Sequence, residues 1–467
     1  MPPQLALVLC LGFIVWLFAK DRESRAALSP GLWIAVIWVA ILGSRPVSIW
    51  LGLGRSMATV DDYVEGSPLD RMVFLSLVVL ALMVLAKRGL RWREVVSRNK
   101  ALLLLYFYFA LSSLWSDYPG VSFKRCLKDL GNVAIVMIIL TEEDPLEAMK
   151  ALFLMCAYLV MPLSALFIKY YPDLGRSYSV SGEQLFTGAA LSKNELGSIL
   201  VISGLFLFLA LLDRRKGLDA AGRRKAIAPV LITLALMAWI AHRANSMTSL
   251  VCFAIGAGLL WGLRRSFLQR WVNHLGLCAA VAAGLVMAYQ MFPGFVGSIL
   301  QMMGRNPTLT GRTDIWNLVL AEHTNPLIGT GFYSFWLGGR VTKFWQMYSF
   351  HLNEAHNGYL ETYLNNGWIG VGLILALLVS AGRKIKDSFL SGGNDAAIRL
   401  VLLIIGTLYN LTESAFNRMG LIWFALLLAV VEYPGRSSRE QPMEPAEQFS
   451  SAEEETQPEL HPDFSNS

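Results

Sequence analysis

One histidine in the last third of the chain has the surroundings of a general base. His356 follows a long polar loop and precedes the apolar run 357–382, with the carboxylates of Glu354 and Glu361 close to it in sequence. An imidazole titrates near working pH, so a histidine beside a carboxylate suits proton abstraction from a hydroxyl group. The competing interpretation is a histidine hydrogen-bonded at a helix end. These residues alone leave both interpretations open.

The residues after His356 predict a membrane helix with glycines on one face. If the helix starts near His356, helical spacing places Leu360, Tyr363, Gly367 and Gly370 on the same face as the histidine. Small residues on such a face let a neighbouring helix approach closely in a bilayer. We therefore expect His356 to point into protein rather than lipid, and an ionisable side chain in that position indicates a functional site.

A metal site is not predicted from these residues. The spacing between His351 and His356 does not put both imidazoles on one helical face, and no H-E-x-x-H pattern occurs. The cysteines lie within or beside apolar runs, with no pair at metal-ligand spacing. We expect neither a metal nor another cofactor.

The second candidate for chemistry is Arg312. Thr310 can cap a helix in which Arg312, Trp316 and either Val319 or Leu320 share one stripe. A guanidinium group beside exposed N–H groups at the positive end of a helix suits a phosphate or pyrophosphate. The alternative is a surface amphipathic helix whose arginine forms a salt bridge.

Two further polar insertions open apolar runs. Lys193 and Asn194 lie in the first, and Arg243 lies in the second, residues 242–249. Charged groups at such depth are costly and normally face the interior of a helix bundle, so both insertions suit the cavity that holds His356. Alternatively, Lys193 and Arg243 extend to the membrane interface. Arg340, among aromatic residues, suits either a phosphate and sugar rings or that same interface.

Composition predicts the fold class. Of 467 residues, 55% are hydrophobic and only 16% are charged, which is typical of an all-α polytopic integral membrane protein. The formal net charge of +6 comes from short basic clusters between apolar runs, so no nucleic-acid partner is expected. Twelve or thirteen membrane helices are predicted from runs at 4–19, 31–51, 69–86, 101–116, 126–140, 147–168, 190–212, 226–241, 246–263, 272–292, 357–382, 397–412 and 417–433.

The basic clusters also predict the orientation of the chain. Alternating runs place clusters 20–25, 87–100, 214–225, 264–270 and 383–386 on one side, which is the cytoplasm by the positive-inside rule. We divide the chain into N-terminal membrane helices (1–292), an extracytoplasmic loop with short helices (293–356), C-terminal membrane helices (357–433) and a disordered cytoplasmic tail (434–467). The first run lacks the basic start of a cleaved signal peptide and is expected to remain a membrane helix.

Several of these residues resemble a known family. His356-Asn357, then nine residues and Gly367-x-x-Gly370, resembles the signature of the O-antigen ligase and polymerase family, bacterial membrane enzymes that act on polyprenyl-pyrophosphate-linked glycans. The segments 193–197, 246–249 and 311–316 are also similar to that family. Segments 114–119, 128–132 and 171–176 look most like its ExoQ-type exopolysaccharide-production branch. The chain departs at Ser192, where the family often has a histidine, and at Met247, where it often has a basic residue.

The resemblance implies a fold of the membrane glycosyltransferase (GT-C-like) type and a metal-independent transfer with lipid pyrophosphate as the leaving group. It implies that His356 deprotonates or positions the acceptor hydroxyl. Arg312, with Arg243 and Arg340, would neutralise the departing pyrophosphate. The other substrate-binding candidates are Lys193, Asn194, Asp314, Trp316, Asn357 and Glu361.

The function expected from the resemblance is polymerisation of lipid-linked repeat units into an exported polysaccharide at the outer face of the bacterial inner membrane. Its partners would be the lipid-linked glycan donor, a glycan acceptor, the bilayer, and chain-length regulators or export proteins. The nearest alternative is a ligase that moves finished glycan from the lipid carrier to another acceptor. An alternative of another class is a transporter or flippase, which predicts broken helices in corresponding halves of the chain.

Overall fold

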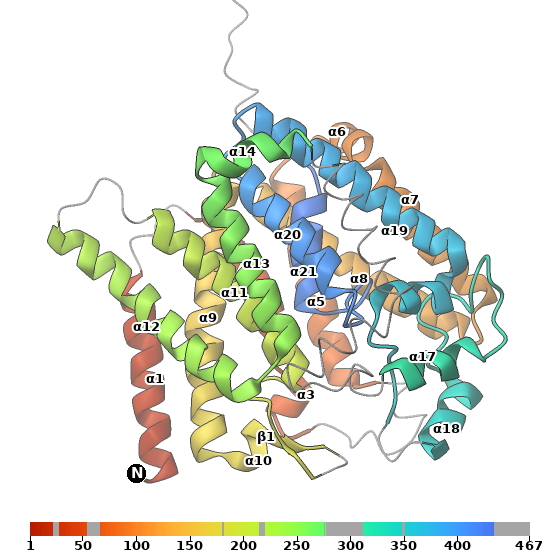
Figure 1. Cartoon of the computed structure of the whole chain (residues 1–467), viewed down its shortest axis with the longest axis horizontal. Helices are drawn as coiled ribbons and strands as arrows, with labels where there is room; N and C mark the ends of the chain where they lie inside the picture. Colours follow the sequence, from red (N-terminus) through yellow and green to blue (C-terminus); the bar gives the residue numbers. More distant parts are fainter. Residues whose placement is uncertain are drawn as a thin grey trace, which may run out of the picture. The chain divides into compact units, whose positions relative to one another are not determined.

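The computed structural model describes residues 1–21, 28–53, 66–179, 182–213, 220–274, 276, 312–347 and 351–433. Within these ranges the chain is almost entirely helical (Figure 1). In the described part of the chain, six helices are long and apolar enough to cross a membrane, and shorter apolar helices accompany them. The chain is an all-α polytopic membrane protein, as the composition predicts.

The helices before the hairpin are α1 (Pro3–Lys20), α2 (Leu32–Leu42), α3 (Val47–Trp50), α5 (Pro68–Lys87), α6 (Trp92–Arg98), α7 (Lys100–Ser112), η2 (Ser113–Trp115), α8 (Pro119–Leu140), α9 (Pro145–Tyr170) and α10 (Pro172–Gly175). The hairpin pairs β1 (Arg176–Tyr178) with β2 (Gln184–Phe186) in antiparallel register. The later helices are α11 (Lys193–Asp213), α12 (Ala220–Ala244), α13 (Met247–Leu263), α14 (Ser266–Val272), α17 (Arg312–Leu320), α18 (Gly338–Met347), α19 (Gly358–Leu390), α20 (Ala396–Tyr409) and α21 (Leu421–Val430).

Helix starts follow local chemistry. Pro68, Pro119 and Pro145 occupy the first turns of α5, α8 and α9, where a missing N–H costs no hydrogen bond. The Asp144 carboxylate caps α9 by accepting a hydrogen bond from the Glu147 N–H at 3.0 Å. The predicted apolar run 272–292 lies almost wholly outside the described residues. Residue Thr310 and the tail 434–467 also lie outside them.

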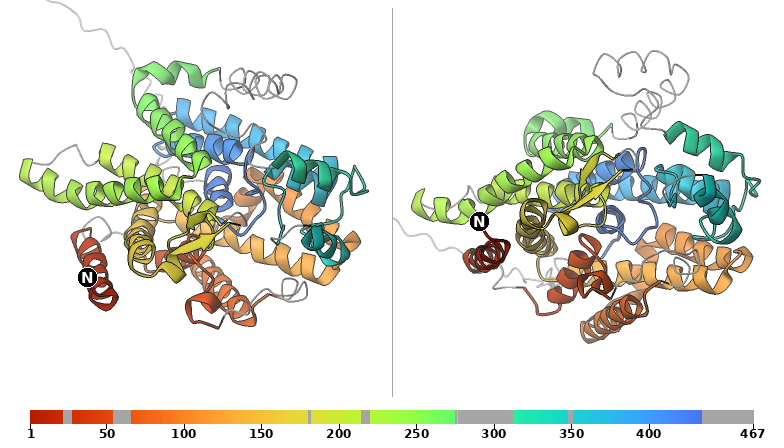
Figure 2. Two further views of the ribbon diagram at one scale, coloured as in Figure 1. Left: turned by 60° about the horizontal axis from the view of Figure 1, so that its bottom comes forward. Right: turned by 90° about the horizontal axis from the view of Figure 1, so that it is seen from below.

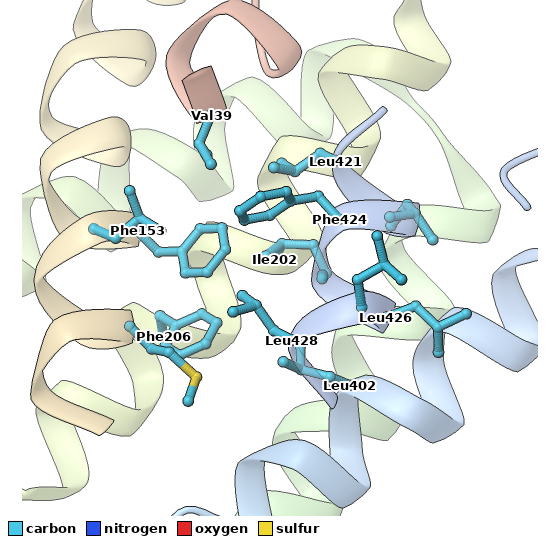
Figure 3. Close-up of a cluster of buried hydrophobic side chains, with 14 of the residues drawn as sticks. Val39, Phe153, Ile202, Phe206, Leu402, Leu421, Phe424, Leu426 and Leu428 are labelled. Atoms are coloured by element: carbon cyan, nitrogen blue, oxygen red, sulfur yellow. The ribbon is translucent and has the colours of Figure 1, made fainter. Parts of the chain in front are cut away.

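The core lies where α9, α11 and α21 meet. The rings of Phe153 and Phe206 stack with centroids 4.4 Å apart, and Val39, Leu402 and Phe424 reach the same cluster from α2, α20 and α21 (Figure 3). In α9, 83% of the most apolar window is buried inside the protein, against 17% in α1, which lies beside α9 and α12 (Figure 2). The apolar surface of α1 therefore faces lipid.

Helix α19 is broken at Gly367. This residue has φ +62° and ψ −168°, and a Cβ there would overlap the Leu327 carbonyl group. The loop before α18 supplies the lost partners: the N–H groups of Trp368 and Ile369 donate to Pro326 and Leu327 at 2.9 and 3.1 Å. Thus Gly367 admits a loop rather than a neighbouring helix, which corrects the prediction of an unbroken glycine face.

The same loop also satisfies the carbonyl groups before the break. Thr330 N–H donates to Leu364 at 3.1 Å, Gly331 N–H donates to Asn365 at 2.8 Å, and the Tyr108 hydroxyl donates to Asn366 at 2.8 Å. Irregular backbone is tolerated in a membrane protein when protein groups pair with it in this way. The break therefore fixes the loop before α18 against α7 and α19.

His356 does not belong to α19, so the predicted helical face through it is wrong. Asn357 is the N-cap, and its side-chain oxygen accepts from the N–H groups of Tyr359 and Leu360 at 3.0 and 3.1 Å. His356 precedes this cap with φ +50°, a conformation uncommon for a residue with a side chain. The capping asparagine stops the helix before the histidine and turns the imidazole away from the helix surface.

Basic connecting segments lie near one end of the helical bundle, and the hairpin and α17 lie toward the other. Figure 1 shows α6 and α14 near the top of the view and α10, β1 and α17 near its bottom. The first two belong to segments that are rich in lysine and arginine. Helix α17 extends over Arg312–Leu320, with Val319 buried and Leu320 exposed, so the predicted stripe continues through Val319.

Candidate active site

The polar groups at the lower end converge on one carboxylate, that of Glu413, in the connection between α20 and α21. Arg312 in the first turn of α17 donates from Nη2 to Glu413 Oε1 at 2.6 Å. His356 Nδ1 lies 3.3 Å from Glu413 Oε2, and Asn194 in the first turn of α11 donates to that same oxygen at 2.9 Å. We call Arg312, His356, Glu354, Glu413 and Arg418 the Glu413 cluster.

The remaining two members of the cluster form a second ion pair. Glu354 Oε1 lies 3.3 Å from His356 Nδ1, and Glu354 Oε2 accepts from Arg418. Arg418 also donates to the Asn353 carbonyl at 3.0 Å. The imidazole therefore stands between two carboxylates, each of which has its own guanidinium group.

The cluster is reachable from outside the protein. The side chains of His356 and Arg418 are each 25% exposed, and that of Arg312 is 16% exposed. Glu413 is the most buried member, with 8% of its side chain exposed. A ligand can reach the imidazole and both guanidinium groups, while Glu413 holds them from beneath.

Burial lowers the pKa of His356, but its environment more than reverses this effect. The hydrogen bond to Glu413 and the charges of Glu354 and Glu413 raise that pKa, and Arg312 opposes them weakly, so the pKa lies above that of an ordinary histidine. A proton on Nδ1 that donates to Glu413 leaves Nε2 as the proton acceptor. The arrangement suits general-base work at neutral pH.

Two serine-rich helix starts support the cluster. A Cβ at Gly197 in α11 would overlap the Ser249 hydroxyl of α13, which itself lies 3.0 Å from the Ser246 hydroxyl. Beside them, the Thr248 and Thr412 hydroxyls are 3.0 Å apart, and Thr412 directly precedes Glu413. The segments 193–197 and 246–249 thus meet at the base of the cluster.

The donor atoms of Glu354, His356 and Glu413 all lie within 4.8 Å of one another, a separation at which three such groups can hold a metal ion. In this structure each carboxylate already pairs with a guanidinium group, Arg312 on Glu413 and Arg418 on Glu354. The charge of each carboxylate is thus already balanced by a guanidinium group, which weakens its attraction for a cation.

Three predicted site residues hold the cluster's backbone in place. Trp316 donates to the Ala355 carbonyl at 2.8 Å, next to His356. Asn357 caps α19, and its N–H donates to the Ser414 hydroxyl at 3.1 Å. Buried Glu361 accepts from Trp336 Nε1 at 2.6 Å and from the Ala355 N–H at 3.0 Å.

Other predicted residues lie elsewhere. Arg340 in α18 pairs with Asp117, and its guanidinium also lies over the Phe335 ring at 5.7 Å. Arg243 at the end of α12 lies 5.7 Å from the ring centroids of Phe186 and Trp239 and lines a cavity between helices. Asp314 in α17 is exposed, and Lys193 is half-buried at the start of α11. His351 stacks on Trp345 at 4.0 Å.

Parts of the sequence are similar to known proteins. Residues 229–375 match the O-antigen ligase family. The exopolysaccharide production protein ExoQ of Rhizobium meliloti is 26% identical over 334 residues, which cover 68% of this chain and 72% of that protein. The chain is thus similar to the O-antigen ligase family over part of its length and to an exopolysaccharide production protein over about two thirds of it.

The segment that matches the O-antigen ligase family contains Arg243, Arg312 and His356, but it ends before Glu413 and Arg418. Sequence reasoning missed these last two residues. A signal was present, since the polar stretch 410–414 interrupts the apolar residues at the end of α20, and an ionisable residue there indicates function by the rule that selected His356. What the sequence did not show is that this stretch folds beneath His356.

Proposed function

We propose that this protein polymerises polyprenyl-pyrophosphate-linked oligosaccharide repeat units into an exported polysaccharide at the outer face of the bacterial inner membrane. The observation that carries the proposal is the convergence of Arg312 and His356 on Glu413. The His356 imidazole suits proton abstraction, and the Arg312 guanidinium group suits an anionic leaving group. Glycosyl transfer from a pyrophosphate needs both.

In this proposal His356 is the general base. The acceptor sugar's hydroxyl oxygen attacks the anomeric carbon of the donor glycan, and the hydroxyl proton passes to Nε2 of His356. Glu413 and Glu354, each 3.3 Å from Nδ1, stabilise the imidazolium that forms.

In this proposal Arg312 stabilises the leaving group. As the anomeric C–O bond breaks, its electron pair passes to the pyrophosphate oxygen, and fixed positive charge stabilises that oxygen. Arg312 exchanges Glu413 for the pyrophosphate, and Arg418 supplies a second guanidinium group nearby. The Glu413 carboxylate that Arg312 releases then interacts with the His356 imidazole and no longer with Arg312, and this raises the basicity of the imidazole.

Orientation and partners follow from the same proposal. The loop that carries α17 and α18 lies on the extracytoplasmic side, and the lysine- and arginine-rich segments lie in the cytoplasm. The substrates are a lipid-linked glycan donor and a second lipid-linked glycan as acceptor. Chain-length regulators and export proteins act on the product.

The test is elongation by the purified protein in liposomes that contain a single kind of radiolabelled lipid-linked repeat unit. We expect a ladder of lipid-linked oligomers and release of polyprenyl pyrophosphate, with no net movement of unreacted lipid between leaflets. Translocation without elongation would establish the flippase alternative and overturn the proposal.

The same experiment also tests the ligase alternative. The family description, O-antigen ligase, favours it, whereas the exopolysaccharide role in the name of the relative favours polymerisation. Addition of a lipid-embedded glycan acceptor distinguishes the two activities. Transfer of label to that acceptor, with no ladder in its absence, would replace the polymerase with a ligase that uses the same residues.

A further inference from the structure

A second site for the lipid carrier lies apart from the Glu413 cluster. We propose that the cavity between α1, α9, α12 and the hairpin binds the head end of an isoprenoid lipid with a terminal phosphate or pyrophosphate. The proposal rests on the proposed function, which brings such a lipid to the protein as substrate and product. The cavity has a volume of about 620 Å³.

Basic side chains gather at one end of this cavity. Lys169 is in the last turn of α9, Arg176 begins β1, and Arg243 is in the last turn of α12. In Figure 1 the same end holds α10 and β1. The fold thus brings cations from three separate segments to the mouth of one cavity.

The described contacts of these three cations are with neutral groups. Arg176 donates from Nε and Nη2 to the Ile168 carbonyl at 2.9 and 2.7 Å, and its guanidinium lies 5.8 Å from the Phe186 ring centroid. The Arg243 guanidinium lies 5.7 Å from the ring centroids of Phe186 and Trp239. Lys169 Nζ lies 5.4 Å from the Tyr170 ring centroid. Among the described residues no carboxylate forms a salt bridge with any of the three, so their charge is available to an anion.

Below this mouth the cavity walls are apolar. Phe13 of α1, Leu166 of α9 and Leu236 of α12 line it, together with Pro162 deeper in α9. From Pro162 to Lys169, and from Leu236 to Arg243, each helix rises roughly 10 Å at about 1.5 Å per residue. The cavity therefore offers positive charge at one end and hydrocarbon contact along the first isoprene units.

Charge favours a terminal phosphate over the phosphodiester of a glycerolipid. A phosphate monoester carries about −1.5 to −2 charge at pH 7, whereas a phosphodiester carries a single negative charge. Two guanidinium forks with an ammonium group match the more highly charged, multidentate head. A carrier lipid with a terminal phosphate or pyrophosphate fits this requirement.

The chain links this cavity to the Glu413 cluster. Arg243 ends α12, Asn245 follows with φ +45°, and Ser246 then begins the serine cluster that contacts Gly197 beneath Glu413. Helix α11, which contributes Asn194, also contacts α12 and α9. The cavity is placed to hold the carrier before or after transfer, while Arg312 holds the pyrophosphate during it.

The test is equilibrium binding of tritiated farnesyl pyrophosphate to the full-length protein in phosphatidylcholine nanodiscs. Arg312→Gln is included throughout, so that the Glu413 cluster contributes less to the signal. Adding Arg176→Gln and Arg243→Gln should weaken binding about tenfold per arginine removed. The matched control adds Arg93→Gln instead, an exposed arginine on α6, and should bind as the Arg312→Gln protein does.

Two competition arms define the ligand. Inorganic pyrophosphate should compete much less well than farnesyl pyrophosphate, and Ala165→Trp, which fills the apolar cavity, should abolish this difference. Dioleoylphosphatidylglycerol should compete weakly. Equal competition by either compound would overturn the isoprenoid assignment, and unchanged binding after loss of Arg176 and Arg243 would overturn the site.

This result is separate from that of the liposome assay. If the wild-type protein elongates no glycan, yet binding depends on Arg176 and Arg243, the proposed polymerase fails and the lipid site stands. If it elongates glycan while binding ignores both arginines, only the lipid site fails.

Discussion

Two of the carboxylate-centred polar clusters among the described residues, those of Asp129 and Glu413, are built in opposite ways. Asp129 of α8 is 1% exposed and accepts from Tyr106 at 2.7 Å, Asn132 at 2.9 Å and Trp423 at 3.1 Å. Trp38 donates in turn to Asn132 at 2.9 Å. Each of these donors is neutral, and together they join α2, α7, α8 and α21.

The Glu413 cluster instead uses charged partners that remain reachable. Its guanidinium groups pair with carboxylates at the ends of helices, and His356 is held at φ +50° between two of those carboxylates. Ion pairs near a surface can exchange one partner for an anionic ligand at modest cost, whereas a buried network loses hydrogen bonds that nothing replaces. We therefore interpret Asp129 as part of the packing and keep the proposed chemistry for the Glu413 cluster.

The largest expected effect is that of His356→Ala. Loss of the general base should reduce elongation by roughly 10²–10⁴-fold, while the protein remains folded because the imidazole is partly exposed. Single lipid-linked repeat units should accumulate in the liposome assay. His351→Ala is the matched control, since that ring stacks on Trp345 outside the cluster. Polymer of normal length from His356→Ala would remove the catalytic assignment.

The next effect is that of Arg312→Gln, which should lower the turnover number by roughly 10²–10³-fold because one fixed charge on the leaving group is lost. Arg312→Lys should recover part of the rate, since an ammonium group keeps the charge but loses the planar fork. Steady-state kinetics with saturating repeat unit measures both. Equal rates for the two variants would mean that Arg312 only orders the structure.

Asp129→Ala should lower the stability of the protein and leave its activity almost unchanged, the opposite of what is expected for His356→Ala and Arg312→Gln. It leaves the donors of Tyr106, Asn132 and Trp423 without their acceptor in a buried site, and should lower the free energy of unfolding by about 2–5 kcal/mol. Elongation per folded molecule should stay within about twofold of the wild type. Thermal unfolding in detergent, followed by tryptophan fluorescence, gives the first quantity. A stable but inactive Asp129→Ala protein would end the distinction between the two clusters.

The smallest effect is a shift in pH dependence. The base must be deprotonated, so elongation should rise with pH through the raised pKa of His356. Glu413→Gln removes a hydrogen bond and a charge that raise this pKa, so the acidic limb of kcat/KM should move to lower pH. Glu354→Gln removes a charge alone and should move the limb in the same direction by less. A shift to higher pH in either variant would contradict the assignment of His356 as base.

Much of the fold was predictable from local chemistry. The apolar runs gave helices wherever the structure describes them, and the stripe of Arg312, Trp316 and Val319 gave α17 with its arginine in the first turn. The start of α19 was misjudged because Asn357 caps it after His356. The break at Gly367 was also missed, since a loop distant in sequence supplies the partners that make it possible.

The candidate site was predictable only in part. His356 and Arg312 were selected from residue type and spacing, and the structure brings both to one carboxylate. Arg243 was expected beside them, but α12 ends at a different cavity and carries the guanidinium there. Glu413 and Arg418 were not selected, because the partner of a charged group is set by packing between segments far apart in the chain.

The sequence by itself determined that this is a helical membrane protein with an ionisable histidine at a helix start and an arginine at another, because hydrophobicity and capping act over a few neighbouring residues. Only the tertiary structure decided that Glu413 joins them, that Asp129 is part of the packing, and that α1, α9 and α12 enclose a cavity with a basic mouth. These features depend on which helices pack together, and the free energy of that packing is summed over contacts distant in sequence.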